Sequence, residues 1–263
     1  MTASATSSKA EFTRAIVRTP CRRIAEGLTS ASLGTPDYDR ALAQHREYVG
    51  ALQKCGLEVT ALPADERYPD SVFVEDTAVL TPHCAIFTNP GAESRQGEVA
   101  AVRAAIAGVF DAVEEIEPPG TVEGGDVMQV GNRFFIGLSK RTNEEGAGQL
   151  IRILNRLGMD GVKVRLNDML HLKTGVNYLE NGWLTITGEF VQKPEFHGFK
   201  QLEIDREEVY AANSLWLNGT VLVPDGFPKT RARIEAAGYE TIAVDVSEFR
   251  KIDGGLSCLS LRY

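Results

Sequence analysis

A unit of helix, strand and hairpin recurs along this chain, and this recurrence limits the available folds more than any other feature. Predicted helices end near positions 56, 110 and 158, about 50 residues apart, and the next clear helix end lies near 238. A repeat of this size indicates copies of one supersecondary unit, arranged around an axis or along a solenoid. Five such units would fit the 263 residues of the chain.

Periodicity and turn residues predict the elements of each unit. Apolar residues at spacings of three and four indicate helices, and short alternating segments indicate strands. Turns such as Gly131-Asn132 and Asn218-Gly219 favour hairpins. We therefore expect helices over 36–55, 93–109, 143–157 and 228–237, single strands over 57–62, 113–116, 162–166 and 241–244, and hairpins that pair 72–80 with 85–88, 126–130 with 134–137, 176–179 with 183–187 and 215–217 with 220–223.

The helix starts and the chain ends carry further predictions. Thr35 would cap the first helix, and Thr142 would form a capping box with Glu145 at the third. A ring of five units closes only if the two chain ends share one unit, and strands over 14–18 and 256–262 could form it. The alternative is an irregular α/β sandwich without closure.

Composition places the chain among ordinary globular proteins. Hydrophobic residues make up 43% and charged residues 24% of the sequence. The formal net charge of −8 argues against nucleic acid or an anionic membrane as a partner, because either needs a basic surface. The chain has no apolar run of the length that spans a bilayer. We expect residues 1–10 to form a flexible tail and residues 11–263 to form a single domain.

The four cysteines show no paired spacing, so the sequence suggests neither a disulfide framework nor a zinc site. Free thiols and the absence of a signal-like segment favour a cytoplasmic location. Cys258 follows Gly254-Gly255, which would let the backbone approach a ligand closely, so it is a candidate nucleophile. The alternative for Cys258 is a small buried hydrophobe. His171, among apolar neighbours, is equally compatible with a functional and a structural role.

Two clusters of carboxylates give a third indication of a functional site. Asp70, Glu75 and Asp76 form one cluster, and Glu123 and Asp126 flank two glycines in the other. Acidic residues inside apolar segments are costly unless a cation or hydrogen-bond donors meet them. Each residue alone could lie at an exposed hairpin end, but this alternative weakens when the two clusters are taken together.

Taken together, the motifs closely resemble those of the dimethylarginine dimethylaminohydrolase family. The segments that carry the resemblance occur in the family's order and cover essentially the whole chain, at 73–77, 123–127, 137–143, 171–173 and 254–258. The family belongs to the guanidine-modifying enzymes. The resemblance therefore implies an α/β fold of the pentein type, a five-bladed α/β-propeller built from pseudo-repeated ββαβ units.

The resemblance also implies roles for ten residues. Cys258 would be the nucleophile, His171 the general acid and base, and Glu123 the residue that holds and polarises His171. Glu75 and Asp76 would grip the guanidinium group of the substrate. The remaining roles concern the amino-acid end of the substrate. Its ammonium group would be bound by Asp70 and by the backbone carbonyls of Leu28 and Ile252, and its carboxylate by Arg95 and Arg141. Residues 27–34 would form a mobile lid.

The implied reaction is hydrolysis of Nω-methylated arginine to citrulline and a methylamine through a covalent cysteine intermediate. It needs no metal and no organic cofactor, and the only partner it requires is the small substrate, although a homodimer is compatible with the family. Physical chemistry agrees with these roles, because planar guanidinium N–H groups match carboxylates.

Two alternatives remain at this stage. One is another guanidine-modifying enzyme, such as an arginine deiminase, although Arg141 leads straight into a single helix and leaves no room for the extra helical insertion of those enzymes. The other is a non-catalytic binding protein of the same fold, which would not need the combination of cysteine, histidine and acid found here.

Overall fold

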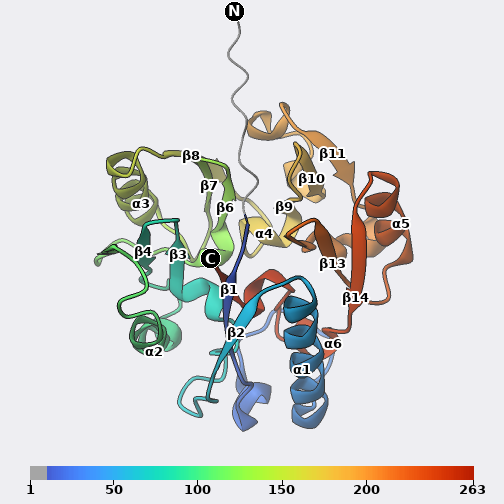
Figure 1. Cartoon of the computed structure of the whole chain (residues 1–263), viewed down its shortest axis with the longest axis horizontal. Coiled ribbons are helices and arrows are strands. Elements are labelled where there is room, and N and C mark those ends of the chain that lie inside the picture. Colours follow the sequence, from blue (N-terminus) through green and yellow to red (C-terminus); the bar gives the residue numbers. More distant parts are fainter. Residues whose placement is uncertain (1–10) are drawn as a thin grey trace, which may run out of the picture.

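Five sheets of three strands each surround the centre of the molecule in the computed structural model, which describes residues 11–263 (Figure 1). The predicted flexible tail over residues 1–10 lies outside the described residues. In strand order the sheets are β3-β4-β5, β6-β7-β8, β11-β10-β9, β12-β13-β14 and β15-β1-β2. This is the five-bladed α/β-propeller that the repeat and the resemblance predicted.

Each blade has the same pairing pattern. Its first two strands pair antiparallel, and its second strand pairs in parallel with the third after a crossover. In four blades the antiparallel pair is a hairpin, and in the fifth its two strands come from opposite ends of the chain. The strands are β1 (Arg14–Arg18), β2 (Glu58–Leu62), β3 (Ala78–Leu80), β4 (Cys84–Phe87), β5 (Ala112–Glu115), β6 (Val127–Val130), β7 (Arg133–Leu138), β8 (Asp160–Arg165), β9 (Val176–Tyr178), β10 (Trp183–Ile186), β11 (Lys200–Glu203), β12 (Leu215–Leu217), β13 (Thr220–Pro224), β14 (Glu240–Val244) and β15 (Leu261–Arg262).

Helices form the crossovers and lie around the outside of the sheets (Figure 1). They are α1 (Tyr38–Lys54), α2 (Val99–Ala105), α3 (Glu144–Arg156) and α5 (Pro228–Ala236), while the short α4 (Leu172–Gly175) and α6 (Ser247–Arg250) lie elsewhere in the repeats. The crossover between β10 and β11 instead uses the 3-10 turns Gly188–Phe190 and Pro194–Phe196. Proline at the start of the second turn and Gly188 at positive φ interrupt helical periodicity, which explains why the sequence showed no helix end near position 200.

The two chain ends meet in one blade, as predicted. Strand β1 pairs antiparallel with β15, with Ile16 opposite Leu261, and pairs in parallel with β2. The pairing closes the ring, so the alternative of an open sandwich is wrong. The C-terminal strand is shorter than predicted, because residues Ser257–Leu259 form a 3-10 turn before it.

Several predicted boundaries are wrong for identifiable reasons. The first helix is capped by Asp37, whose side chain accepts from the Arg40 N–H at 2.8 Å, instead of by Thr35. The third is capped by Asn143, because the buried Thr142 hydroxyl accepts from the Glu123 N–H. Two longer segments are also divided by 3-10 turns: Val74–Thr77 within the predicted strand 72–80, and Glu93–Glu98 within the predicted helix 93–109.

The hydrophobic core consists of five clusters, and each contains strand residues from two neighbouring blades. Alternate strand residues and the inner stripes of the helices supply these clusters. Among residues 11–263, no helix has both the length and the apolar character needed to cross a bilayer. That these residues form one domain stays a prediction, which a single cooperative unfolding transition would support.

Ring closure leads to a test of stability. The buried Tyr48 hydroxyl, on α1, donates to the Leu256 carbonyl at 2.9 Å and lies 2.6 Å from the Ser260 hydroxyl. It thus joins the N-terminal and C-terminal parts of the shared blade. We expect Tyr48→Phe to lower the free energy of unfolding by about 1–3 kcal/mol, because buried acceptors lose their donor. Urea unfolding measures this loss, and a loss no larger than that of Tyr38→Phe would contradict the explanation.

Candidate active site

His171 is positioned by a glycine turn that packs against one side of the imidazole. It precedes α4, in extended conformation, and its side chain is buried. A Cβ atom at Gly125 would lie 2.7 Å from the imidazole Nδ1, so only glycine allows the ring to pack against this turn. Gly125 is therefore explained by close approach to the histidine, and Gly124 by close approach to the Glu75 carbonyl, which a Cβ there would meet.

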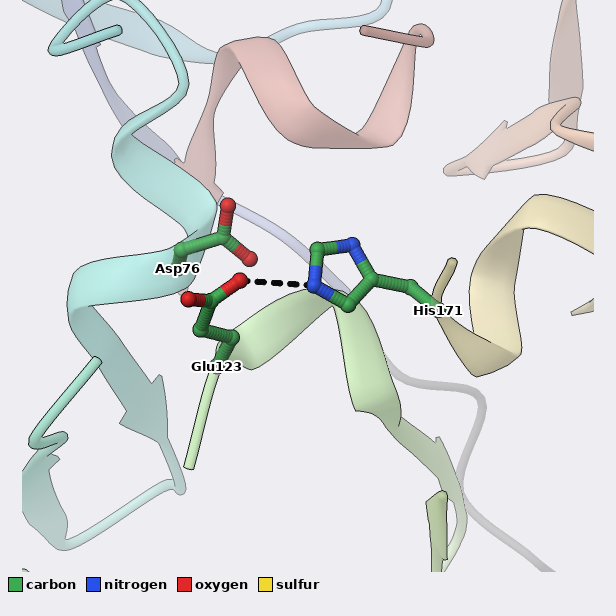
Figure 2. A group of neighbouring side chains, drawn as sticks. All are labelled: Asp76, Glu123 and His171. Carbon is green, nitrogen blue, oxygen red and sulfur yellow. Dashed lines mark hydrogen bonds and ion pairs between the residues drawn. The ribbon is translucent and has the colours of Figure 1, made fainter. Parts of the chain in front are cut away.

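Glu123 holds the other side of the imidazole. Its Oε2 lies 2.7 Å from His171 Nε2, and Figure 2 shows Asp76, Glu123 and His171 pointing toward one another. The same carboxylate accepts from Arg141 Nη1 at 3.1 Å and from the Ala92 N–H. Glu123 is fully buried, so its charge depends on these donors for its stability.

The buried carboxylates favour a protonated imidazole. Burial alone would lower the pKa of His171, but Asp126, Asp76 and Glu123 outweigh it and raise that pKa. The pKa of Glu123 is lowered, because His171, Arg95 and Arg141 outweigh the effect of burial. The resting pair is therefore an imidazolium ion and a carboxylate, which suits His171 to donate a proton.

Asp76 is held by an arginine that is itself buried between two acids. Arg95 Nη1 donates to Asp76 Oδ2 at 2.6 Å, and Arg95 Nε and Nη2 donate to Glu98 at 3.1 and 2.9 Å. The other oxygen of Asp76 accepts from the Gly125 N–H at 2.8 Å. Within residues 11–263, a single N–H group at Arg95 Nη1 lacks an acceptor, so this arginine can offer one hydrogen bond to a ligand.

Cys258 lies in the 3-10 turn Ser257–Leu259, directly after the second glycine pair. Its sulfur accepts from the Gly255 N–H at 3.4 Å, which favours the thiolate. Burial and the nearby charges of Glu75 and Asp76 act the other way and raise the pKa of the thiol to about 12. In the free protein the cysteine is therefore a neutral thiol at neutral pH, and a cation placed beside it would favour ionisation.

Cys258 and His171 line the same cavity, of about 240 Å³. Eight of the ten predicted site residues line it: Leu28, Asp70, Asp76, Arg95, Arg141, His171, Ile252 and Cys258. Glu123 stands directly behind His171. An adjoining cavity of about 300 Å³ shares Cys258 and His171 with it and is lined by Leu33, Met169 and Val209 among others.

Polar groups of opposite character line this cavity. Asp70 is buried, accepts from the Leu28 N–H at 2.9 Å, and has its pKa raised by burial against the opposing effect of Arg95. Arg141 is partly exposed, and its Nε and Nη2 have no acceptor within residues 11–263. The predicted lid lies over this region, with Ser30 bonded to Asp253 at 2.6 Å through its N–H.

Glu75 lies apart from the cavity-lining group of predicted site residues. It is absent from the lining of the cavity that holds Cys258, and its Oε1 accepts from Lys173 at 2.6 Å and from Arg262 at 2.9 Å. Its Oε2 accepts from the Ser257 hydroxyl at 2.9 Å. Two cations already neutralise this carboxylate, and its grip on the guanidinium stays a prediction. The 3-10 turn Val74–Thr77 sends Glu75 and Asp76 to different surroundings.

Asp76, Glu123 and His171 also form a group that a metal ion could bind, with ligand atoms within 4.8 Å of one another. However, Asp76 faces the guanidinium of Arg95, and Glu123 faces both Arg141 and the imidazolium. A metal ion would have to displace these positive charges, so the donor set fits an internal ion-pair network better.

Sequence reasoning missed Glu98, which shares Arg95 with Asp76. Glu98 is buried, and burial raises its pKa to about 7 against the opposing effect of Arg95. The spacing Arg95-x-x-Glu98 was a usable signal, because residues three apart share one side of a helical turn.

Comparisons with known proteins agree with this geometry. Residues 35–188 match the family model described as N,N dimethylarginine dimethylhydrolase, eukaryotic. The chain is 54% identical over 253 residues to N(G),N(G)-dimethylarginine dimethylaminohydrolase of Pseudomonas aeruginosa. The alignment covers 96% of this chain and 100% of that protein. The chain belongs to the dimethylarginine dimethylaminohydrolase family. The family member from Streptomyces coelicolor is 37% identical to this chain, and the alignment covers 95% of this chain and 96% of that protein.

Solved structures of this dimethylarginine dimethylaminohydrolase family superpose closely. A Cys-to-Ser mutant of the P. aeruginosa enzyme complexed with citrulline matches with a TM-score of 0.95 at 54% identity, over 97% of this chain and 100% of that one. An adduct of a His-to-Gly variant with S-methyl-L-thiocitrulline matches with a TM-score of 0.94 at 54% identity, over 96% and 100%. The N-terminal domain of a cyanobacterial arginine dihydrolase shares the fold. It matches with a TM-score of 0.86 at 19% identity, over 96% of this chain and 97% of that one.

The pairing of Glu123 with His171 gives a test of the electrostatics. Glu123→Gln keeps the shape of the side chain but removes one negative charge that raises the pKa of His171. We expect the imidazole to lose its proton at a lower pH than in the wild type, which NMR titration of the ring measures. An unchanged midpoint would show that Asp76 and Asp126 alone hold the proton.

Proposed function

We propose that this chain hydrolyses Nω-methylated arginines to citrulline and a methylamine, with Cys258 as nucleophile and His171 as general acid and base. The observation that carries the proposal is that both side chains line one cavity whose other polar groups suit an amino acid with a cationic head. Family membership supports the same reaction, and the relative from P. aeruginosa bears the name of this activity. Asymmetric dimethylarginine and monomethylarginine are the proposed substrates.

The amino-acid end of the substrate would bind between Asp70 and Arg141. Asp70 is anchored by the Leu28 N–H and offers its remaining acceptor capacity to the ammonium group, together with the Leu28 and Ile252 carbonyls. The substrate carboxylate would accept from the N–H groups of Arg141 that have no acceptor in the protein. Arg95 would add at most one further hydrogen bond. Decarboxylated substrates would leave these arginines unpaired, which disfavours them.

The guanidinium head would lie against Asp76, beside Cys258. Asp76 lines the cavity and has lone pairs beyond those used by Arg95 and Gly125. Glu75, which the resemblance also assigned to the guanidinium, serves in our proposal to support the turn of Cys258 through Ser257. The substrate charge is thus localised and kept, as a guanidinium that cannot lose its proton near neutral pH requires.

The same charge would activate the thiol. At an effective dielectric constant near 20, the attraction between a thiolate and a cation about 4 Å away is roughly 4 kcal/mol. This corresponds to nearly three units of pKa, which brings the thiol down from a pKa of about 12 toward the neutral range. The substrate would therefore create the nucleophile that attacks it. The thiol proton would pass to solvent, since His171 is already protonated, and would return to the sulfur once uncharged citrulline has replaced the cation.

The reaction then proceeds in two balanced halves. The thiolate forms a bond to the guanidinium carbon, the imidazolium of His171 gives its proton to the leaving nitrogen, and the C–N bond breaks to release the amine. A cationic thiouronium remains on Cys258. Water, deprotonated by the neutral His171, adds to that carbon, the C–S bond breaks, and citrulline leaves. The remaining proton is taken up by the released amine, which leaves as an ammonium ion.

The first test replaces the nucleophile. Cys258→Ser should abolish citrulline formation from asymmetric dimethylarginine, because a serine hydroxyl beside buried carboxylates does not ionise near neutral pH. Circular dichroism and citrulline binding should stay close to the wild type. Turnover within tenfold of the wild type would remove Cys258 from the mechanism. Assaying ammonia and dimethylamine on arginine and its methylated forms separates this activity from that of an arginine deiminase.

The second test concerns Arg141. Arg141→Ala should raise KM, because it removes charge-assisted hydrogen bonds of roughly 1.5–3 kcal/mol, or about 10- to 150-fold in kcat/KM. The exposed neighbour Lys140 provides the control, and Lys140→Ala should leave kcat/KM unchanged. An unchanged KM in the Arg141 variant would place the substrate carboxylate elsewhere.

Two expectations from the sequence stay predictions. A cytoplasmic location rests on the free thiols, and fractionation with an activity assay would test it. A homodimer is compatible with the family, and sedimentation of the purified protein would determine its oligomeric state.

A further inference from the structure

Asn213 occupies a position in the repeat that supplies the candidate catalytic residues elsewhere. Asp76 precedes β3, Glu123 precedes β6, His171 precedes β9 and Cys258 precedes β15, each by two to five residues. Asn213 precedes β12 by two residues, at the end of the 3-10 segment Arg206–Ala212. The corresponding segment of the remaining blade therefore also ends beside the centre, and its polar residue is a buried amide.

The Asn213 amide bridges the segments of the nucleophile and of the acid. Its Oδ1 accepts from the Ser257 N–H at 2.9 Å, one residue before Cys258. Its Nδ2 donates to the Lys173 carbonyl at 2.9 Å, two residues after His171, and to the Ser257 hydroxyl at 3.0 Å. Both N–H groups of the amide are thus used, and they join segments that lie more than 80 residues apart in sequence.

These partners fix the orientation of the amide. Ser257 presents an N–H, which needs the oxygen, and Lys173 presents a carbonyl, which needs an N–H. A flipped amide would set donor against donor and acceptor against acceptor. Gly255 packs directly on the side chain, since a Cβ there would lie 2.7 Å from Asn213 Cγ, and its N–H in turn donates to the Cys258 sulfur. The amide therefore supports the whole turn that presents the thiol.

We propose that Asn213 is a positioning residue that holds the Cys258 turn and the His171 segment in the relative placement that the reaction requires. The proposal rests on the proposed function, in which sulfur and imidazole act on the same carbon and leaving nitrogen. Because a displacement of about 1 Å between reacting groups can cost a hundredfold in rate, one rigid amide between the two segments has a large effect. Asn213 does not line the cavity that contains Asp70 and Arg141, so we expect its effect to fall on kcat.

Asn177 provides a matched control. It is also a buried asparagine, and its Nδ2 donates to the same Lys173 carbonyl at 2.7 Å and to the Ala212 carbonyl at 2.8 Å. It makes no hydrogen bond to Ser257 or Cys258 within the described part of the chain. The two variants Asn213→Ala and Asn177→Ala therefore remove similar buried amides, and only the first releases the nucleophile turn.

The experiment compares kcat, KM and the rate at which 2-chloroacetamidine alkylates Cys258, followed by mass spectrometry. For Asn213→Ala we expect kcat and the maximal alkylation rate to fall about 10- to 100-fold, with KM within about threefold of the wild type. For Asn177→Ala we expect both rates within about threefold, whatever its loss in thermal stability. Equal losses in the two variants would overturn the proposal, as would an unchanged kcat or a rise confined to KM in Asn213→Ala.

A second variant keeps the test decisive if Asn213→Ala does not fold. Asn213→Asp has the same shape and can still accept from Ser257, but it cannot donate to Lys173 and adds a negative charge near the sulfur. We expect a comparable fall in kcat and an alkylation profile shifted to higher pH. A wild-type kcat and pH profile in this variant would overturn the proposal. Turnover by Cys258→Ser would instead defeat the proposed function itself, so the two failures are distinguishable.

Discussion

The pairing of β15 with β1 is the constraint on which the site depends. Cys258 lies three residues before β15, so the sulfur reaches the cavity only when the C-terminal strand joins the blade begun by the N-terminal strand. The Tyr48 hydroxyl adds a second link at the same junction. The candidate active site is therefore complete only when the ring is closed.

The charges at the centre form a network that is nearly complete without substrate. Arg95 lies between Asp76 and Glu98, Arg141 and His171 share Glu123, and Lys173 and Arg262 share Glu75. Buried charges are tolerated only when paired in this way. Asp70, by contrast, has a pKa raised by burial and accepts one backbone N–H, so it is the buried acid that gains most from an added ammonium group. The network holds the acids fixed, which reduces reorganisation when a cationic substrate binds.

Much of the architecture could be predicted from the sequence, because hairpin turns and helix periodicity are local signals. The closing blade was predictable from the requirement that a five-unit chain share one unit. The fourth crossover was not, since Pro194 and Gly188 replace its helix with 3-10 turns that leave no periodic pattern. The different surroundings of Glu75 and Asp76 could not be predicted either. Alternation in a strand would place the two side chains on opposite faces. It does not reveal the 3-10 turn, or the ion pairs of Glu75 with Lys173 and Arg262 from remote segments.

The arrangement of the site follows from the symmetry of the fold. The first strands of the blades contact one another near the centre, β6 with β9, β9 with β12 and β15 with β3. The segment before each first strand must therefore end at the centre, and each of these segments contains a short helical turn. Five equivalent positions meet there, and each can carry a different chemical group: carboxylate, carboxylate, imidazole, amide and thiol. Such a fold can therefore change its chemistry by substitution at these positions without altering the blades, because the strands that follow them are held by pairing and packing alone.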